Sequence, residues 1–177
     1  AVGSRLAPHV HKLSQDTLTS ATASVREVME SLLPDAAMTF VVDGRGVSGF
    51  VTPSDLNRHP ARAHFYLLLA DLEIALSGLV RGYFLDLDEA VALLHPKSQG
   101  VVRKRFNADR SNNLETDLAA GMDVGHFLRI VGRTPTLRAQ LGTRNEASWD
   151  SMTMGLPALR DAVMHPSLEF LGRSRSL

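Results

Sequence analysis

Apolar positions in the first sixty residues follow two different periods. Within residues 24–33 they recur at three- and four-residue steps, at Val25, Val28, Met29, Leu32 and Leu33. This spacing predicts an amphipathic helix that ends before Pro34. Residues 38–42 and 47–52 are rich in β-branched residues instead, and the Asp43-Gly44 pair between them favours a tight turn. The chain is therefore expected to begin with mixed helix and strand.

From residue 61 onward the apolar pattern has the helical period throughout. It predicts five helices, at residues 63–84, 88–94, 98–109, 118–131 and 149–164. Pro157 lies inside the last of them and predicts a kink or a new start there. Pro53 follows Thr52 as at a helix start, so we expect a helix that runs from there into the long one. The expected fold is α+β, with a small α/β unit at residues 1–60 and an all-α helical bundle at residues 61–177.

The composition changes this picture mainly by exclusion. Of the 177 residues, 19 are Lys or Arg and 19 are Asp or Glu, so the formal net charge is zero, which argues against a globally basic nucleic-acid binder. The chain has no Cys, and this removes disulfides, Cys-zinc sites and thiol nucleophiles. Uninterrupted apolar runs stay far below the roughly 18 residues of a membrane span, and the first residues lack an apolar signal core. We expect a cytoplasmic protein with no membrane partner.

Residues 41–56 have the most distinctive order of elements. Their glycine-rich turn matches G-x-G-x-x-G, but a strand follows it where the dinucleotide fingerprint needs a helix, so a hairpin is the better interpretation. Helix, strand, Asp-Gly turn, strand and Thr-x-x-Asp together resemble a CBS motif over residues 10–60. The resemblance implies that Thr52 and Asp55 hold the ribose of an adenine nucleotide, which would be a regulatory ligand.

Two alternatives accompany this resemblance. Thr52 and Asp55 are three residues apart, so they also fit a capping box that only starts a helix. CBS motifs work in pairs and one is visible here, which implies a homodimer or a second copy trimmed from the N-terminus. The ligand-binding and the structural interpretations of Thr52 and Asp55 both stay open.

Near the C-terminus, residues 159–166 run Leu-Arg-Asp-Ala-Val-Met-His-Pro. Arg160, the polar residue after it, and His165 at the end of the last long helix resemble the signature of the HEPN superfamily, over residues 61–170. The usual residue after the arginine is Asn, and Asp161 stands there in this chain. The resemblance implies a HEPN-like helical bundle, a homodimer, and a metal-independent ribonuclease site of Arg160, Asp161 and His165.

The chemistry of these three residue types fits RNA transesterification. Asp161 and His165 are four residues apart and share a helix face, so the carboxylate can orient the imidazole. His165 then acts as general base or acid, and Arg160 neutralises charge on the phosphorane oxygens. The product ends in a 2′,3′-cyclic phosphate, and no metal or cofactor is required. In the alternative interpretation Arg160 and Asp161 form a salt bridge and His165 caps the helix end.

A basic stretch and several isolated histidines are the other candidates. The stretch holds Lys97, Arg103, Lys104, Arg105 and Arg110. It either guides RNA phosphates or forms a solvated helix face. His64, His95 and His126 lack metal-ligand spacing, which argues against a bound metal.

These observations favour a homodimeric HEPN-type endoribonuclease that an adenine nucleotide gates at the CBS-like unit. The alternative is a non-enzymatic CBS/HEPN protein, regulatory or dimerising, that binds nucleotide or RNA. A structural dimer with neither activity is a third interpretation.

Overall fold

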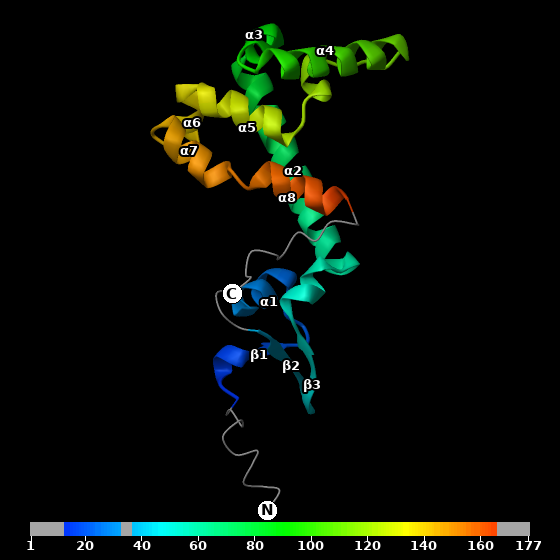
Figure 1. Cartoon of the computed structure of the whole chain (residues 1–177), viewed down its shortest axis with the longest axis vertical. Coiled ribbons are helices and arrows are strands. Elements are labelled where there is room, and N and C mark those ends of the chain that lie inside the picture. Colours follow the sequence, from blue (N-terminus) through cyan, green and yellow to red (C-terminus); the bar gives the residue numbers. More distant parts are fainter. Residues whose placement is uncertain (1–12, 33–36, 166–177) are drawn as a thin grey trace, which may run out of the picture. The chain divides into compact units, whose positions relative to one another are not determined.

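The computed structural model describes residues 13–32 and 37–165, and these form two compact units. The first unit holds the described residues up to His64, and the second those from Phe65 to His165. The first contains a small sheet and the second contains helices, so the fold is α+β (Figure 1).

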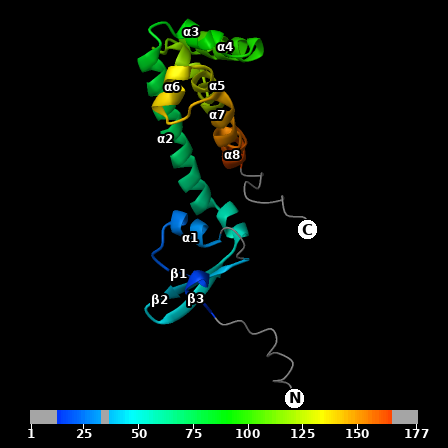
Figure 2. The ribbon, with the colours of Figure 1, turned by 90° about the vertical axis from the view of Figure 1, so that its left-hand side faces the viewer.

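The first unit has a three-stranded sheet and one α-helix. Its elements are η3 (Gln15–Thr17), β1 (Leu18–Ser20), α1 (Val25–Leu32), β2 (Thr39–Asp43), β3 (Gly46–Val51) and η4 (Pro53–Asn57), where η marks a 3-10 helix. β1 pairs parallel to β2, and β3 pairs antiparallel to β2, so the strand order is β1-β2-β3 (Figure 1). Figure 2 shows the same sheet after a 90° turn. The predicted helix and hairpin are therefore confirmed, although residues 33 and 34 lie outside the described part.

The turn of the hairpin uses a different glycine from the expected one. Gly46 has φ of +131°, a backbone conformation that favours glycine. The Asp43 carboxylate accepts a hydrogen bond from the Arg45 backbone N–H at 2.8 Å, as acids at turns often do. The sequence places the turn correctly, but Gly46 and not Gly44 supplies the positive φ.

The expected continuous helix from Pro53 into the long helix is wrong. η4 ends at Asn57, and Arg58 is extended with ψ of 163°. A new helix, α2 (His59–Tyr83), starts directly after it. Pro60 explains the break, because proline lacks the N–H that an interior helical position needs but fits the first turn of a helix.

The second unit is helical throughout its described residues. After α2 it contains α3 (Leu87–Ala92), α4 (Pro96–Ser111), η5 (Leu118–Gly121), α5 (Val124–Arg133), α6 (Pro135–Gln140), α7 (Glu146–Thr153) and α8 (Leu156–Met164). The predicted long, short and basic helices correspond to α2, α3 and α4. The restart predicted at Pro157 is confirmed, because α8 begins with this proline in its first turn.

Two boundaries in the second unit differ from the prediction. The helix expected at residues 118–131 is divided into η5 and α5, because the Asp123 side chain accepts the His126 backbone N–H at 3.2 Å and starts a new helix. α6 was not predicted, although Pro135 after Thr134 is a helix-start signal. Side-chain capping thus divides a segment whose apolar period is continuous.

The core of the second unit lies around α5 and Trp149. Trp149 is buried and donates its indole N–H to the Leu128 carbonyl at 2.9 Å, which joins α7 to α5. Gly132 allows this approach, since a Cβ there would lie 2.8 Å from the Trp149 ring atom Cδ1. Gly121 plays the same part between η5 and α4, with a virtual Cβ 2.7 Å from the Val102 carbonyl oxygen. Small residues therefore set the close packing of this unit.

α2 satisfies a length and composition test for a membrane-spanning helix. It is the one helix in the described part of the chain that does so, and 28% of its most apolar 18-residue window is buried. Asp71 and Glu73 interrupt the apolar run. Core helices of globular proteins pass the same test, so the finding alone assigns no membrane to the chain.

Candidate functional site

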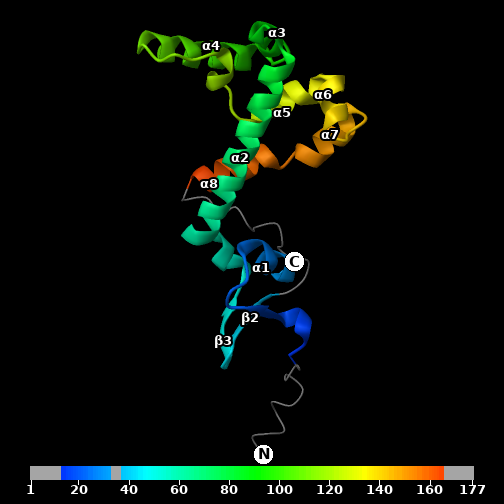
Figure 3. The same ribbon diagram turned by 180° about the vertical axis from the view of Figure 1, so that it is seen from behind.

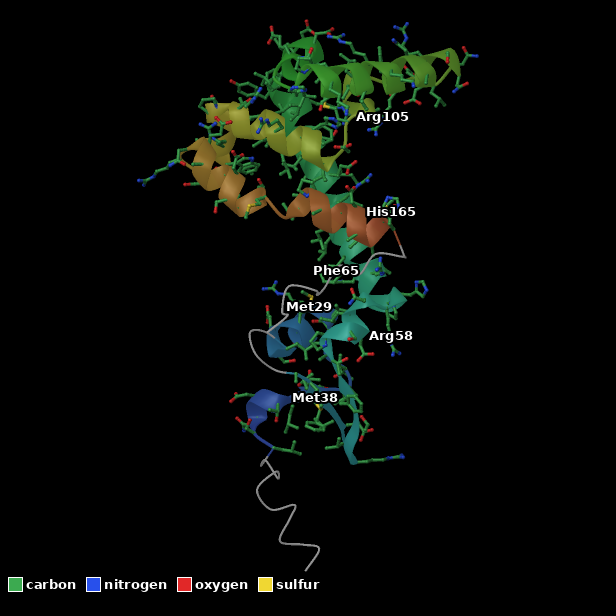
Figure 4. The ribbon with its side chains drawn as sticks, in the orientation of Figure 1. Met29, Met38, Arg58, Phe65, Arg105 and His165 are labelled. Atoms are coloured by element: carbon green, nitrogen blue, oxygen red, sulfur yellow. The ribbon has the colours of Figure 1, made fainter. Side chains whose placement is uncertain are left out.

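The predicted catalytic residues lie on α8 and at its end. Val163 is buried and turns one face of the helix toward the unit. Asp161 is largely exposed on another face. His165 ends the helix as its C-cap with extended backbone (φ −107°, ψ 101°), as expected for a residue that precedes Pro166. Figure 4 shows His165 at this end of α8, while Pro166 itself lies outside the described residues.

Arg160 forms an ion pair with its neighbour. Its Nη1 lies 3.3 Å from Asp161 Oδ1, and the two side chains are 34% and 65% exposed. An exposed pair of this kind contributes little stability. The salt bridge of the alternative interpretation is therefore present, and it holds the guanidinium at the surface.

The guanidinium also borders a pocket between α8 and α2. This pocket, of about 220 Å³, is lined by Tyr66, Leu69, Ala70, Glu73, Ile74, Arg160 and Met164. It is largely apolar, and Glu73 is its carboxylate. The long helix α2 holds two internal acids, Asp71 and Glu73, and Glu73 is the one that lines this pocket. α8 crosses α2 here in the front and rear views (Figures 1 and 3).

His165 lies outside the lining of this pocket. Arg160 and His165 are five positions apart, which is about 140° around a helix of 3.6 residues per turn. A main-chain hydrogen bond of 3.0 Å from the His165 N–H to the Asp161 carbonyl closes the last turn. Within one chain the structure thus brings Arg160 and Asp161 into contact, and His165 lies at the exposed helix end, outside the lining of this pocket.

In the first unit, Thr52 and Asp55 bond to each other. Asp55 Oδ2 accepts the Thr52 backbone N–H at 2.9 Å and the Thr52 hydroxyl at 2.8 Å. Asp55 Oδ1 lies 3.0 Å from Arg58 Nε. These bonds, above all the one from the Thr52 N–H, lower the pKa of the Asp55 carboxyl. The predicted capping interaction is confirmed, and both carboxylate oxygens are engaged in it or in the ion pair.

A pocket of about 360 Å³ lies beside this capping interaction. It is lined by Ala23, Val25, Val28, Phe50, Val51, Asp55, Leu56, Arg58, Pro60 and Ala61. Apolar side chains form most of the wall, and Phe50 is 61% exposed. Asp55 and Arg58 add one charge of each sign (Figure 4 labels Arg58). Phe50 and Arg58 are not predicted as binding residues from the sequence, although Arg58 stands one helical turn after Asp55.

An ion pair between Arg81 of α2 and Asp117, the residue before η5, is also not predicted from the sequence. We call this ion pair the clamp. Arg81 binds Asp117 with two hydrogen bonds, of 2.6 Å from Nε and 2.9 Å from Nη2, and a third goes to the Ser77 hydroxyl. The pairing raises the pKa of Arg81 and lowers that of Asp117. Because Asp117 also accepts the Ala120 N–H at the start of η5, the clamp ties α2 to η5, and this role is structural.

Within residues 13–32 and 37–165, no three His, Asp or Glu side chains are grouped to hold a metal ion. RNA cleavage without a metal ion therefore stays a prediction from the sequence. No protein-family model, no curated protein and no solved structure matches the chain. The resemblances to CBS and HEPN modules therefore rest on the motifs and on the order of the elements.

Proposed function

We propose that the protein is a metal-independent endoribonuclease of HEPN type, with Arg160, Asp161 and His165 at its site. The observation that supports this best is the exposed end of α8, which carries a guanidinium, a carboxylate and an imidazole within six residues. These are the groups that phosphodiester transesterification uses without a metal. The helical unit provides the rigid support, and α8 packs on it through Val163.

In the proposed reaction the ribose 2′-hydroxyl attacks the neighbouring phosphorus. One His165 takes the proton of that hydroxyl as general base, and the 5′-oxygen leaves with a proton from an acid or from water. The new O–P bond closes a 2′,3′-cyclic phosphate, and the broken P–O bond frees a 5′-hydroxyl. Arg160 stabilises the extra negative charge that the phosphorane oxygens carry in between.

A second copy of the chain completes the site in this proposal. Arg160 lines the pocket on α8 and His165 of the same chain does not, so in this proposal the imidazole at that pocket comes from a partner. Exposed apolar side chains surround that pocket, with Tyr66 49%, Ile74 70% and Met164 43% exposed. Such a cluster gains free energy when a partner covers it, and twofold pairing is the commonest arrangement of two copies.

The first unit is proposed to bind an adenine nucleotide as a regulatory ligand. The pocket beside Asp55 offers an apolar wall with Phe50 for a base and a carboxylate for ribose hydroxyls. Binding there requires Asp55 Oδ2 to exchange its bonds with Thr52 for bonds to the ligand. A ligand at this pocket can regulate RNA cleavage only if it binds the active and the inactive state of the protein with different affinities.

The test is cleavage of labelled single-stranded RNA in EDTA by the wild type and by His165→Ala. The proposal predicts 2′,3′-cyclic ends from the wild type and a loss of at least about 100-fold in rate for the variant. His59→Ala, which removes an exposed histidine of the first unit, is the matched control and keeps full activity. Equal cleavage by wild type and His165→Ala contradicts the catalytic role.

The second candidate is a non-enzymatic dimer that regulates by binding nucleotide or RNA. The Arg160–Asp161 ion pair favours it, because a carboxylate beside the guanidinium weakens the attraction of that guanidinium for phosphate. This candidate predicts a dimer that binds nucleotide or RNA and leaves RNA uncut in the same assay.

A further inference from the structure

Charge is segregated within the helical unit. α4 carries five basic residues and one acid, whereas the rest of residues 65–165 carries six basic and eleven acidic residues. The zero net charge of the chain therefore hides one positive helix in an otherwise negative unit. Such a helix is the electrostatic footprint expected of a surface that meets a polyanion.

α4 uses little of its surface for packing. Val102 is its one buried residue within the described chain, and half-buried positions such as Gln99 and Phe106 flank it. This inner face packs on η5 and α3. The C-terminal part of α4 extends away from the other helices of its unit (Figures 1 and 3). Most of the helix surface is thus exposed to solvent.

Two of the five basic residues already have acidic partners. Arg103 lies 2.5 Å from an Asp88 carboxylate oxygen, and Arg105 lies 3.5 Å from Asp123. Arg105 also donates to the Gly121 carbonyl at 3.2 Å (Figure 4 labels Arg105). These two arginines attach α4 to the rest of the unit, and their charge is largely compensated.

The other three basic residues carry the uncompensated charge. Lys97 and Lys104 are seven positions apart, so they lie within about 20° of each other on the outer face and about 10 Å apart along the axis. We call this pair the lysine crest. Arg110 lies on a flank of the helix with its guanidinium 5.7 Å from the centre of the Phe106 ring. Both lysines are exposed, and the acid of the helix, Asp109, lies at its half-buried side.

We propose that the lysine crest, with Arg110 beside it, is the docking surface for the sugar-phosphate backbone of single-stranded RNA. This inference rests on the proposed function, since RNA is the substrate there, and it places substrate binding on a helix other than α8. The outer face offers no aromatic ring for base stacking. Contacts by lysines to phosphates are salt-dependent and independent of sequence.

The experiment measures binding of fluorescent oligouridine in EDTA, in a His165→Ala background that leaves the RNA intact. Lys97→Gln/Lys104→Gln removes two positive charges from α4. The control Arg129→Gln/Arg144→Gln removes two positive charges from exposed positions elsewhere in the same unit. Each protein is titrated between about 50 and 200 mM salt.

We expect the crest variant to bind at least about ten-fold more weakly and its salt slope to fall by about 1.4, since each single-strand phosphate contact contributes about 0.7. The control is expected to stay within about two-fold of its parent in affinity. Equal weakening in both variants, or in neither, overturns the inference. Binding to phosphatidylserine vesicles that depends on the crest, without RNA binding, also overturns it.

The outcomes separate this inference from the proposed function. If the wild type cleaves RNA and the crest variant binds RNA as well as its parent, the docking inference is wrong and the proposed nuclease function stands. If RNA binding depends on the crest but the wild type cuts no RNA, the docking inference is supported and the proposed nuclease function is wrong.

Discussion

The two units differ most in how much apolar surface they bury. The helical unit has a continuous core of sixteen buried residues from α2 to α7. In the described part of the first unit the buried apolar side chains are Leu32, Leu56 and Ala61. Its sheet leaves Val47 and Phe50 more than half exposed. Within the described residues, the helical unit therefore buries the larger apolar core.

This difference fits the roles that the proposed function gives to the two units. A rigid core holds reacting groups in fixed positions, which catalysis requires, and α8 is attached to that core. A unit with a small core gains much of its stability from whatever binds it. In the proposed function, the pocket beside Phe50 and Asp55 is where a regulatory ligand would add this stability. The predictions below test the contrast, beginning with the largest expected effect.

Replacing Trp149 by Ala removes the central side chain of the larger core. The change deletes a buried ring and the hydrogen bond from its indole N–H to the Leu128 carbonyl, so we expect a loss of about 3–5 kcal/mol of unfolding free energy. Urea denaturation measures it. Met152→Ala, at a 58% exposed position of the same helix, is the control and changes stability by less than about 0.5 kcal/mol. A small effect at Trp149 contradicts the assignment of stability to this core.

Two helical glycines provide a second, smaller test. In Gly132→Ala the new Cβ meets the Trp149 ring at 2.8 Å, and we expect a loss of about 1–3 kcal/mol. In Gly100→Ala the new Cβ meets open space on α4, and the better helix propensity of Ala adds about 0.5–1 kcal/mol. Thermal unfolding of both variants checks the opposite signs. If both substitutions change the stability in the same direction, close packing against Trp149 does not limit the residue at position 132.

The smallest predicted effect depends on pH. A hydrogen bond with the His126 side chain, above all, lowers the pKa of Asp123 from 3.8 to about 2. The ionised carboxylate is thus favoured in the folded state, so its contribution is complete above pH 4 and is lost as pH falls toward 2. We expect about 1 kcal/mol. Asp123→Asn removes this loss of unfolding free energy between pH 4 and pH 2, whereas Asp150→Asn, at an exposed position, keeps it. Urea denaturation at a series of pH values measures the difference. Identical acid profiles for the two variants contradict the assignment.

The sequence predicted the elements better than it predicted their boundaries. The spacing of apolar residues identifies α1, the hairpin and the long helix, because burial of one face of an element is enough to produce a periodic apolar pattern. The break at Asp123 is hidden because apolar residues continue in register across it, and a side-chain hydrogen bond overrides the period. The stop after Asn57 could have been found from Pro60 alone.

The candidate site shows the same limit more strongly. The order Arg160, Asp161 and His165 is local, so the sequence finds the motif and places it on a helix end. Glu73 and Arg160 line one pocket although they are far apart in the sequence, and no local spacing encodes this. The engagement of both Asp55 oxygens likewise depends on where Arg58 turns after η4. Tertiary packing decides which acids are available and which are already paired.

The most direct measurement of the central claim is subunit complementation in RNA cleavage. Arg160→Ala and His165→Ala are each expected to be inactive alone. When the two variants are co-expressed, half of the dimers are mixed, and each mixed dimer holds one site with an intact Arg160 from one copy and an intact His165 from the other. The account predicts recovery of about a quarter of the wild-type rate, with 2′,3′-cyclic ends. A co-expressed mixture as inactive as either variant contradicts it.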